Sequence, residues 1–589
     1  MSIKVLKGNS EKMIQLKINN VAIKAEEGMS VLDAAKSVGI HIPTLCHLKD
    51  LTPTGACRIC VVEVEGQRNL VPSCAYPVFK GMSVETNSAR VRRARKTIVE
   101  LLVENHPQDC LVCVRNKNCE LQDLSDKYSV REHRYVGEKK DHAIDISSAS
   151  IERDPAKCIL CGRCVRVCHE VQKVGAIDFT KRGFLSTVTT PYNKGINISD
   201  CILCGQCILV CPTAALREKS SMKEVAAALN DKRKFTVVQI APAVRATLGE
   251  EYNMPPGTEV TGKLITGLRR LGFNKVFDTN FSADLTIMEE ATELIHRINN
   301  NGKLPMFTSC CPGWVKYAEH NKPEILEHIS TCKSPHEMEG AVLKTYYAKK
   351  MEIDPKDIFV VSIMPCTVKK YESSRSELKE ESYADVDAVL TTRELTRFFK
   401  LAGIEFNDLP EDNFDDPLGE STGAAAIFGT SGGVMEAALR TAYYKLTGKE
   451  LETLELEPVR GDKNIKEISI KISDMELNFA VVNGIGNIKP IIDDIQNGTS
   501  KYHFIEVMTC PGGCVNGGGQ PIHQKNDKIQ KRMKALYQID SNMTYRRSHE
   551  NESVKILYEE FFTEPNSYCA HEILHTKYFD RKIKRKTQI

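Results

Sequence analysis

The chain has 589 residues, which at roughly 150 residues per domain suggests about four domains. Its 80 basic and 77 acidic side chains give a net charge of +3, so charge offers no general argument for binding nucleic acid or membranes. No stretch approaches the roughly 18 apolar residues of a membrane span, and the start lacks an apolar signal core, so we expect a cytoplasmic protein. The 22 cysteines, mostly in closely spaced groups, indicate metal sites rather than a disulfide scaffold.

The first predicted domain spans 13–89 and is of the α+β type. Alternating apolar residues from Ile14 predict a hairpin that turns at Asn19 and Asn20, and Ser30 is expected to cap the short helix VLDAAKSV. A loop and a strand (VVEVE) then carry four cysteines with C-x10-C-x2-C-x13-C spacing: Cys46, Cys57, Cys60 and Cys74. The plant-type [2Fe–2S] pattern has a shorter first gap, so spacing alone leaves zinc open as the alternative.

The second predicted domain, 90–138, begins with the basic-to-apolar helix RVRRARKTIVELLVEN. Four potential ligands follow with H-x3-C-x2-C-x5-C spacing: His106, Cys110, Cys113 and Cys119. The same residue types build zinc sites with three thiolates and one imidazole. The position between two other cluster domains favours a [4Fe–4S] cube, and the polar residues over 120–148 predict a connector.

The third predicted domain, 139–220, contains an internal repeat in which CILCGRCVRVC and CILCGQCILVC start 43 residues apart. In two-cluster ferredoxins the fourth cysteine of each run ligates the other cluster. The repeat therefore predicts two [4Fe–4S] cubes, one held by Cys158, Cys161, Cys164 and Cys211, the other by Cys201, Cys204, Cys207 and Cys168. Four thiolates packed in one run suit cubes better than the separated pairs of zinc ribbons.

The last predicted domain, 221–589, alternates apolar runs such as FTVVQI and IFVVSIM with helical patterns, which favours an α/β region with mostly parallel sheets and two lobes. Sparse cysteines follow apolar runs in TSCCPGW, MPCTVKK and MTCPGGCVNGGGQP. Ligands collect beyond the carboxyl ends of strands in such sheets, so we expect these cysteines to meet in one cleft. The glycines at 512, 513 and 517–519 would let the backbone approach a bulky cofactor.

These three motifs closely resemble the active-site signatures of [FeFe]-hydrogenases, and the upstream layout is similar to the clostridial-type multi-cluster enzymes from about residue 13 to about 578. The resemblance implies an α/β multidomain fold: a β-grasp plant-type ferredoxin domain, a small helical domain with the histidine-ligated cluster, a two-cube ferredoxin-like domain and a two-lobed catalytic domain with an H-cluster in its cleft. The cube of this H-cluster would be held by Cys311, Cys366, Cys510 and Cys514. Cys514 would also bridge to a diiron subsite carrying CO, cyanide and an azadithiolate.

The resemblance also implies a proton path that starts at Cys310, the proton donor of the family. A thiol titrates near 8.5 when unperturbed, so surroundings that lower its pKa would let it exchange protons near neutrality. Glu290, Glu293 and Arg297 share one face of the predicted helix ADLTIMEEATELIHRI, a pattern that is more often a solvated stripe. Family resemblance instead places Glu290, Ser330 and Glu293 between Cys310 and the surface.

Further residues are assigned by the same resemblance. Lys369 would donate to a cyanide ligand, and the pocket would be shaped by Pro242, Ala243, Met364, Phe428 and Met508. Ordinary core packing is the alternative for the methionines and Phe428. The leftover Cys332 and Cys569 are expected to be buried small hydrophobes. His571 to His575 match the H-E-x-x-H zinc protease pattern, which we interpret as the structural end of the chain because no third ligand is evident.

The expected function is therefore a ferredoxin hydrogenase, with the reaction 2H⁺ + 2e⁻ ⇌ H₂ and four accessory clusters that relay electrons. Expected partners are ferredoxin or flavodoxin, with flavin/NAD(P) subunits as the alternative, together with maturation factors for the diiron subsite. The basic runs RVRRARK and RKIKRK are interpreted as solvated surface or a docking patch for an acidic carrier rather than nucleic-acid sites. An electron-transfer subunit like that of respiratory complex I is a weaker alternative, because it has no need of Cys310 beside Cys311 or of the Cys510/Cys514 pair. An H₂ sensor is weaker because Cys310, Glu290 and Glu293 are all present, and an assembly factor is weaker because the accessory cluster set is complete.

Overall fold

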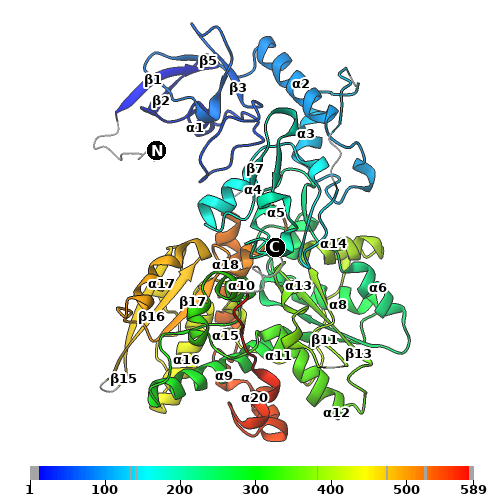
Figure 1. The fold of residues 1–589 in the computed structure, drawn as a ribbon, viewed down its shortest axis with the longest axis vertical. Helices are drawn as coiled ribbons and strands as arrows, with labels where there is room; N and C mark the ends of the chain where they lie inside the picture. The colour runs from blue at the N-terminus through cyan, green and yellow to red at the C-terminus, as the bar shows by residue number, and fades with distance from the viewer. Residues whose placement is uncertain are drawn as a thin grey trace.

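The computed structural model describes residues 12–132, 134–139, 143–380, 382–472, 475–522 and 527–582. The amino-terminal sheet lies at one end of the molecule, the cysteine repeat lies in the middle, and the large α/β region forms the other end (Figure 1). Within these ranges no helix is both long and apolar enough to cross a membrane. Most of the basic run RKIKRK, from residue 583 onward, lies outside the described residues.

The amino-terminal domain is a five-stranded sheet packed on one helix, in the order β2-β1-β5-β3-β4. Its elements are β1 (Met13–Ile18), β2 (Val21–Glu26), α1 (Val31–Ser37), β3 (Val61–Val64), β4 (Val71–Pro72) and β5 (Ser83–Glu85). The predicted hairpin is confirmed: β1 pairs with β2, and Asn19 and Asn20 turn with positive φ angles of 47° and 64°. The predicted cap is also confirmed, since the Ser30 hydroxyl accepts the Asp33 N–H at 3.1 Å.

Two helices form the next domain, α2 (Ala89–Glu104) and α3 (Glu120–Lys127). The first confirms the predicted basic-to-apolar helix. The second shows that the predicted connector over 120–148 is wrong at its start. Leu121 and Leu124 lie three residues apart on one helix face and are both buried, and Leu124 packs in one core cluster with Val99 of α2. Two leucines at this spacing are enough to bury one face of a two-turn helix.

The repeat region is built from short, matched elements. They are β6 (Ile151–Arg153), α4 (Arg163–Arg166), β7 (Asp178–Thr180), β8 (Thr187–Thr189), α5 (Gln206–Val210) and β9 (Leu216–Glu218). Gly162 and Gly205 precede α4 and α5 with φ angles of 70° and 71°, in the left-handed region that favours glycine. The sequence repeat is therefore also a repeat of backbone conformation.

The large α/β region contains two four-stranded sheets, ordered β11-β10-β13-β14 and β12-β17-β16-β15. The first has β10 (Phe235–Ile240), β11 (Lys275–Asp278), β13 (Ile358–Met364) and β14 (Ala388–Thr391); the second has β12 (Met306–Phe307), β15 (Ile465–Ile472), β16 (Met475–Asn483) and β17 (Phe504–Met508). All neighbours are parallel except β15 with β16. The predicted parallel α/β region with two lobes is confirmed.

Helices surround the two sheets (Figure 1). They include α6 (Met222–Asn230), α8 (Thr261–Leu271), α9 (Thr279–Asn299), α10 (Pro312–Asn321), α11 (Pro335–Val342), α14 (Thr392–Leu401), α16 (Gly433–Thr447), α17 (Lys489–Gln496), α18 (Asp527–Asn542), α19 (Glu552–Leu557) and α20 (Tyr568–Leu574). Helix α9 contributes Phe281 and Leu285 to the core of the first sheet and Ile287 and Leu294 to that of the second. Glu289, Glu290 and Glu293 of α9 are therefore buried, whereas His296 near its carboxyl end is exposed.

Candidate active site and cluster-binding sites

The cysteines of the three sparse motifs meet in one cavity between the two sheets. The cavity contains about 810 Å³ of space outside protein atoms, and its lining includes Cys310, Cys311, Cys366, Cys510 and Cys514. The first two follow β12, Cys366 follows β13 and Cys510 follows β17, so the carboxyl ends of parallel strands from both sheets bring them together.

The predicted pocket residues also line this cavity. They are Pro242, Ala243, Met364, Lys369, Phe428 and Met508. Met364, Phe428 and Met508 belong to hydrophobic core clusters as well, so the cavity wall and the core are continuous there. Sequence reasoning missed His336 and Thr509, which line the same cavity. Thr509 stands directly before Cys510 and gave a positional signal, whereas His336 gave none.

Packing against neighbouring backbone explains why residues near Cys514 are glycines. A Cβ at Gly517 would lie 2.3 Å from the Pro365 carbonyl oxygen, and one at Gly513, where φ is 93°, would lie 2.6 Å from the Ser431 N atom. Gly513 and Gly517 do line the cavity. Close packing of this loop on neighbouring backbone therefore excludes a side chain at both positions.

Lys369 is held at the cavity by two oxygen atoms. Its Nζ donates to Glu372 Oε2 at 2.7 Å and to the Cys310 carbonyl at 3.2 Å. Burial acts to lower the pKa of Lys369, but the charge of Glu372 outweighs it and the pKa is raised. Glu372 also accepts a hydrogen bond from His336 Nε2 at 2.7 Å. The lysine therefore remains a buried cation beside the cysteines.

Burial determines the direction in which the pKa of Cys310 is shifted. Burial raises the pKa of its thiol well above the usual value, and the neighbouring Glu290 acts in the same direction. The surroundings therefore do not lower this pKa, because the thiol is buried beside an acidic neighbour. The side chain is consequently a protonated thiol rather than a thiolate.

The charged residues of α9 are buried and connected, so the alternative of a solvated stripe is wrong. Glu290 is fully buried, and neither of its carboxylate oxygens has a hydrogen-bond partner in the described chain. Burial and the neighbouring charge of Glu293 raise the pKa of Glu290 to about 8. Ser330 Oγ donates to Glu293 Oε2 at 2.8 Å, and Arg297 pairs with Glu293 Oε1 at 2.6 Å. Glu293 is thus bonded to both Ser330 and Arg297, and Glu290 precedes it by about one turn of α9.

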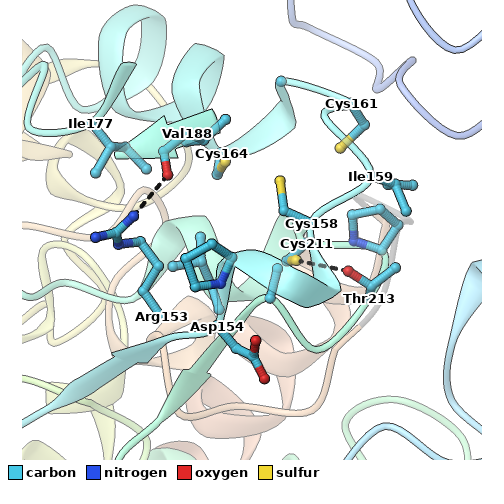
Figure 2. A pocket seen from close by; sticks show the side chains of 15 residues that line it. Arg153, Asp154, Cys158, Ile159, Cys161, Cys164, Ile177, Val188, Cys211 and Thr213 are labelled. Atoms are coloured by element: carbon cyan, nitrogen blue, oxygen red, sulfur yellow. Dashed lines mark hydrogen bonds between the residues drawn. The ribbon is translucent and has the colours of Figure 1, made fainter. Parts of the chain in front are cut away.

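The cysteine repeat encloses two cavities of similar size, about 480 and 490 Å³. One is lined by Cys158, Cys161, Cys164 and Cys211, the other by Cys168, Cys201, Cys204 and Cys207. Figure 2 shows the sulfurs of the first set around a common space, with Cys211 arriving from the second run. The grouping is the crossed one that the repeat predicts.

Backbone N–H groups point at several of these sulfurs. Leu160 N–H donates to Cys158 Sγ at 3.4 Å, Leu203 N–H donates to Cys201 Sγ at 3.4 Å, and Ala176 N–H donates to Cys168 Sγ at 3.3 Å. Donors aimed at sulfur stabilise thiolates and tune iron–sulfur clusters. Burial raises the pKa of the Cys201 thiol to about 11, so a bound cation is needed to hold it as a thiolate.

The four cysteines of the amino-terminal domain also converge. Cys60 Sγ and Cys74 Sγ are 3.4 Å apart, and Cys46 N–H donates to Cys57 Sγ at 3.3 Å. Hydrogen bonds with Cys57 and Cys74 lower the pKa of Cys46. No disulfide joins any of the 22 cysteines, all of which belong to the described residues, so these close sulfurs are not disulfides.

The histidine-containing group lies between α2 and α3. His106 follows the end of α2, Cys110 and Cys113 flank a single turn closed by a 3.2 Å backbone hydrogen bond, and Cys119 caps α3. His106 Nδ1 is buried and has no hydrogen-bond partner among the described residues. Such an orphaned ring nitrogen fits a metal ligand.

Cys332, Cys569 and the H-E-x-x-H motif were expected to have structural roles, and the structure agrees with this in part. Cys332 is fully buried as expected, although its Sγ lies 3.9 Å from Glu293 Oε2. Cys569 is only half-buried, because it lies in the exposed first turn of α20. His571 and His575 stack with ring centroids 4.0 Å apart, instead of pointing both rings at one free site.

Comparison with known proteins agrees with this geometry. The family model of the iron-only hydrogenase large subunit, C-terminal domain, matches residues 234–518, and that of the iron hydrogenase small subunit matches 526–581. The chain is 48% identical to the NADP-reducing hydrogenase subunit HndD of Solidesulfovibrio fructosivorans, over 97% of this chain and 99% of that protein. The chain belongs to the iron-only, or [FeFe], hydrogenases. This hydrogenase is also 44% identical to iron hydrogenase 1 of Clostridium pasteurianum, over 95% of this chain and 99% of that one.

Three further family models match the upstream part of this hydrogenase. A 2Fe-2S cluster binding domain matches 11–89, the iron–sulfur binding region of NADH-ubiquinone oxidoreductase G matches 95–134, and a 4Fe-4S dicluster domain matches 157–215. They favour iron–sulfur clusters over the zinc sites that spacing had left open. The solved [FeFe]-hydrogenase HydA1 of Chlamydomonas reinhardtii matches with a TM-score of 0.56 and 43% identity, over 62% of this chain and 99% of that one.

The hydrogenase is therefore an iron–sulfur oxidoreductase with accessory cluster domains. A weaker likeness, 32% over 59% of the chain, extends to the cytosolic Fe-S cluster assembly factor narfl of Xenopus tropicalis. Sequence reasoning treated 221–589 as one domain and missed that its last part matches a separate small subunit family.

Proposed function

We propose that this hydrogenase catalyses 2H⁺ + 2e⁻ ⇌ H₂ with ferredoxin as electron carrier, four accessory iron–sulfur clusters and a proton path through Cys310, Glu290, Ser330 and Glu293. The observation that carries the proposal is the cavity that six cysteines line, with the buried Glu290 close enough to one of them, Cys310, to raise its pKa. A pure electron-transfer subunit has no need of either feature.

Ligand sets follow from the convergence of the cysteines. Cys46, Cys57, Cys60 and Cys74 would hold the [2Fe–2S] cluster, His106 with three cysteines would hold one [4Fe–4S] cluster, and the crossed repeat would hold two more. Cys311, Cys366, Cys510 and Cys514 would hold the cube of the H-cluster. The free close-packed sulfurs, the N–H groups aimed at them and the unpartnered His106 Nδ1 support this assignment.

When bound, the H-cluster supplies an open metal site and a nearby base for making or cleaving H₂ heterolytically. The chain's own residues prepare the surroundings. Met364, Phe428 and Met508 form an apolar wall that limits water. Lys369 Nζ presents a positive charge fixed by Glu372 and can donate a hydrogen bond to a cyanide ligand. Cys310 Sγ holds a proton because burial raises the pKa of the thiol.

Protons move between Cys310 and the outer end of the path by exchange at carboxyl oxygens. Glu290, with a pKa raised to about 8, is largely protonated near neutrality and can exchange its proton with either neighbour. The Ser330 hydroxyl, already bonded to Glu293 Oε2, can pass a proton by rotating. The order of these groups supports a path from the cavity toward Arg297 at the rim.

The position of Cys204 supports direct electron exchange between the repeat and the active-site cavity. Cys204 lines both the second cavity of the repeat and the active-site cavity. The absence of a side chain at Gly518 allows its loop to approach Cys204 closely, because a Cβ there would lie 2.4 Å from the Cys204 carbonyl oxygen. We infer that the second cube is the immediate neighbour of the H-cluster.

Ferredoxin or flavodoxin is the proposed carrier, and flavin/NAD(P) partner subunits are the second candidate. Exposed Arg90, Arg92 and Arg93 on α2, near the outer clusters, favour an acidic carrier. The name of HndD, a subunit of an NADP-reducing hydrogenase, favours the second candidate. The cytoplasmic location remains a prediction.

The test is H₂ evolution from dithionite-reduced viologen by protein matured and purified without oxygen, with iron counted on the same sample. Rapid H₂ evolution is expected, and ferredoxin should replace viologen as donor. A fully iron-loaded, correctly matured sample that makes no H₂ would contradict the proposal and favour a sensor or an electron-transfer subunit.

A further inference from the structure

The end of the chain places a histidine against the outer end of the proposed proton path. His575 Nδ1 lies 2.7 Å from Thr331 Oγ1, and its Nε2 lies 3.1 Å from Glu289 Oε2. One ring nitrogen, Cys332 Sγ and a carboxylate oxygen of Glu293 all lie within 4.8 Å of one another. The imidazole is buried, although it belongs to the segment that matches the small subunit family.

Backbone pairing fixes this position. The Lys333 N–H donates to the Leu574 carbonyl at 2.8 Å, and the Thr576 N–H donates to the Thr331 carbonyl at 2.8 Å. Two hydrogen bonds on either side of His575 join it to the strand-like segment after Ser330. The imidazole therefore has a defined place beside the path rather than a variable one.

Glu293 needs a proton-exchanging neighbour that Arg297 cannot provide. The guanidinium binds Glu293 Oε1 through Nε at 3.1 Å and through a terminal nitrogen at 2.6 Å. An arginine stays protonated in proteins, so it holds the carboxylate in place but passes no proton. Cys332 is also unsuitable as the outer group, because its side chain is completely buried and does not reach solvent. Within the 4.8 Å cluster this leaves the imidazole of His575.

A second histidine, His571, lies beside this imidazole at the surface. His571 is exposed, and its ring stacks on that of His575 with centroids 4.0 Å apart and planes inclined by 21°. Burial and the neighbouring His575 lower the pKa of His571, which favours release of a proton to water. The pair thus extends from beside Glu293 to the surface.

We propose that His575 is a proton-relay residue that transfers protons between Glu293 and the surface next to His571. This inference rests on the proton path of the proposed function. During H₂ oxidation the Glu293 carboxylic acid loses its O–H proton and neutral His575 gains an N–H proton; the imidazolium then releases one N–H proton to water at that surface. H₂ evolution reverses these steps, and no electron moves in either direction.

The groups around His575 suit a transient positive charge. Glu289 and Glu293 face it from α9, Thr331 and Cys332 face it from the paired segment, and His571 faces it from α20. Glu289 is itself held by the hydroxyl of Tyr558 at 2.5 Å and by the N–H of Asn566 at 2.8 Å. A fixed, buried carboxylate beside the ring stabilises the imidazolium and orients it.

The experiment compares His575→Gln and His575→Ala in the fully matured enzyme. The control is His549→Gln, which removes another stacked histidine of the carboxyl-terminal region, on Tyr444, away from the path. Iron content should be unchanged, and turnover of both His575 variants should fall on the order of 10²-fold, the lower end for a positioned proton-transfer group. Added imidazole should restore turnover in His575→Ala, and the pH–rate profiles of both variants should differ in shape from that of the wild type.

Glu293→Gln, measured in parallel, separates the two proposals. Wild-type turnover of both His575 variants alongside an inactive Glu293→Gln would overturn the relay and leave the path intact. Full activity of Glu293→Gln would overturn the path itself. If His575→Ala loses iron, the test rests on His575→Gln. A loss of turnover in His575→Gln that is the same at every pH would show a structural role for His575 and would overturn the relay.

Discussion

The hydroxyl of Ser330 donates a 2.8 Å hydrogen bond to Glu293, so a residue of the segment between α10 and α11 and a residue of α9 are joined inside the protein. Arg297 binds the other oxygen of the same carboxylate at 2.6 Å. Glu293 is thus a buried, oriented group between the inner Glu290 and the rim of the lobe. This arrangement makes its role in proton transfer directly testable.

Glu293→Gln should leave iron content unchanged and lower H₂ turnover by about 10²–10⁴-fold, because the amide keeps the shape but cannot exchange a proton. The measurement is H₂ evolution and uptake on iron-quantified enzyme. Glu452→Gln, at an exposed glutamate, serves as the control and should match the wild type. Full turnover in Glu293→Gln would exclude this carboxylate from the path.

Cys310→Ser should also retain its iron but lose nearly all turnover. The serine hydroxyl is a far weaker acid than a thiol, and proton transfer in the active-site cavity then lacks its donor; the expected loss is about 10²–10⁴-fold. The control is Cys569→Ser, which changes a half-buried cysteine outside every site. Normal H₂ evolution by Cys310→Ser would contradict the proton-donor role.

The sequence predicted those features that depend on local spacing. The Asn19-Asn20 turn, the Ser30 cap and the crossed cavities of the cysteine repeat all follow from residues near one another in the chain. The convergence of Cys311, Cys366 and Cys510 was also predictable, because each follows a strand of a parallel sheet and carboxyl ends share one edge.

Features that depend on contacts distant in sequence were not predictable in this way. One such feature is the burial of charged residues on α9. Charges on a helix usually indicate a solvent-exposed face, and only the structure shows that both lobes enclose Glu290. The direction of the Cys310 pKa shift was another, since it depends on burial. The contact between His575 and the segment after Ser330 joins residues 244 positions apart, at Thr331 and His575.

His106→Ala should impair electron delivery from outer donors while leaving the active-site cavity intact. Among the described residues His106 Nδ1 is buried and has no hydrogen-bond partner, so removing the ring would take away the proposed cluster ligand without breaking a hydrogen bond at that atom. We expect less iron per chain and slower ferredoxin-linked turnover. His41→Ala, at an exposed histidine of the neighbouring domain, is the control. Unchanged iron and unchanged ferredoxin-linked activity would show that the histidine-ligated cluster is wrongly assigned.

Glu290 should make stability depend on pH. Its folded-state pKa of about 8 is above the ordinary value for glutamate, so folding favours the protonated form. The stabilising contribution is complete at acidic pH and is lost as the pH rises through about 8, with a slope of up to about 1.4 kcal/mol per pH unit. Glu290→Gln cannot ionise and should flatten this decline in denaturant unfolding of the full chain. An unchanged slope would show that Glu290 titrates normally.

The contact between the repeat and the active-site cavity can be tested at two equivalent glycines. Gly205 and Gly162 have nearly equal φ angles of 71° and 70°, so alanine at either position meets the same backbone strain, about 1–2 kcal/mol. Only Gly205 lies at the contact: its Cβ would be 2.6 Å from Thr367 Oγ1 and 2.9 Å from Gly518 Cα, whereas a Cβ at Gly162 meets only the Phe179 ring at 3.1 Å.

Gly205→Ala should therefore destabilise the protein more than Gly162→Ala and displace Cys204 from the active-site cavity. We expect slower H₂ evolution in Gly205→Ala when electrons enter through ferredoxin, with iron content preserved. Thermal unfolding and ferredoxin-linked turnover of the two variants are the measurements. Equal effects of the two alanines would mean that the close approach of Gly205 to Gly518 does not govern electron delivery.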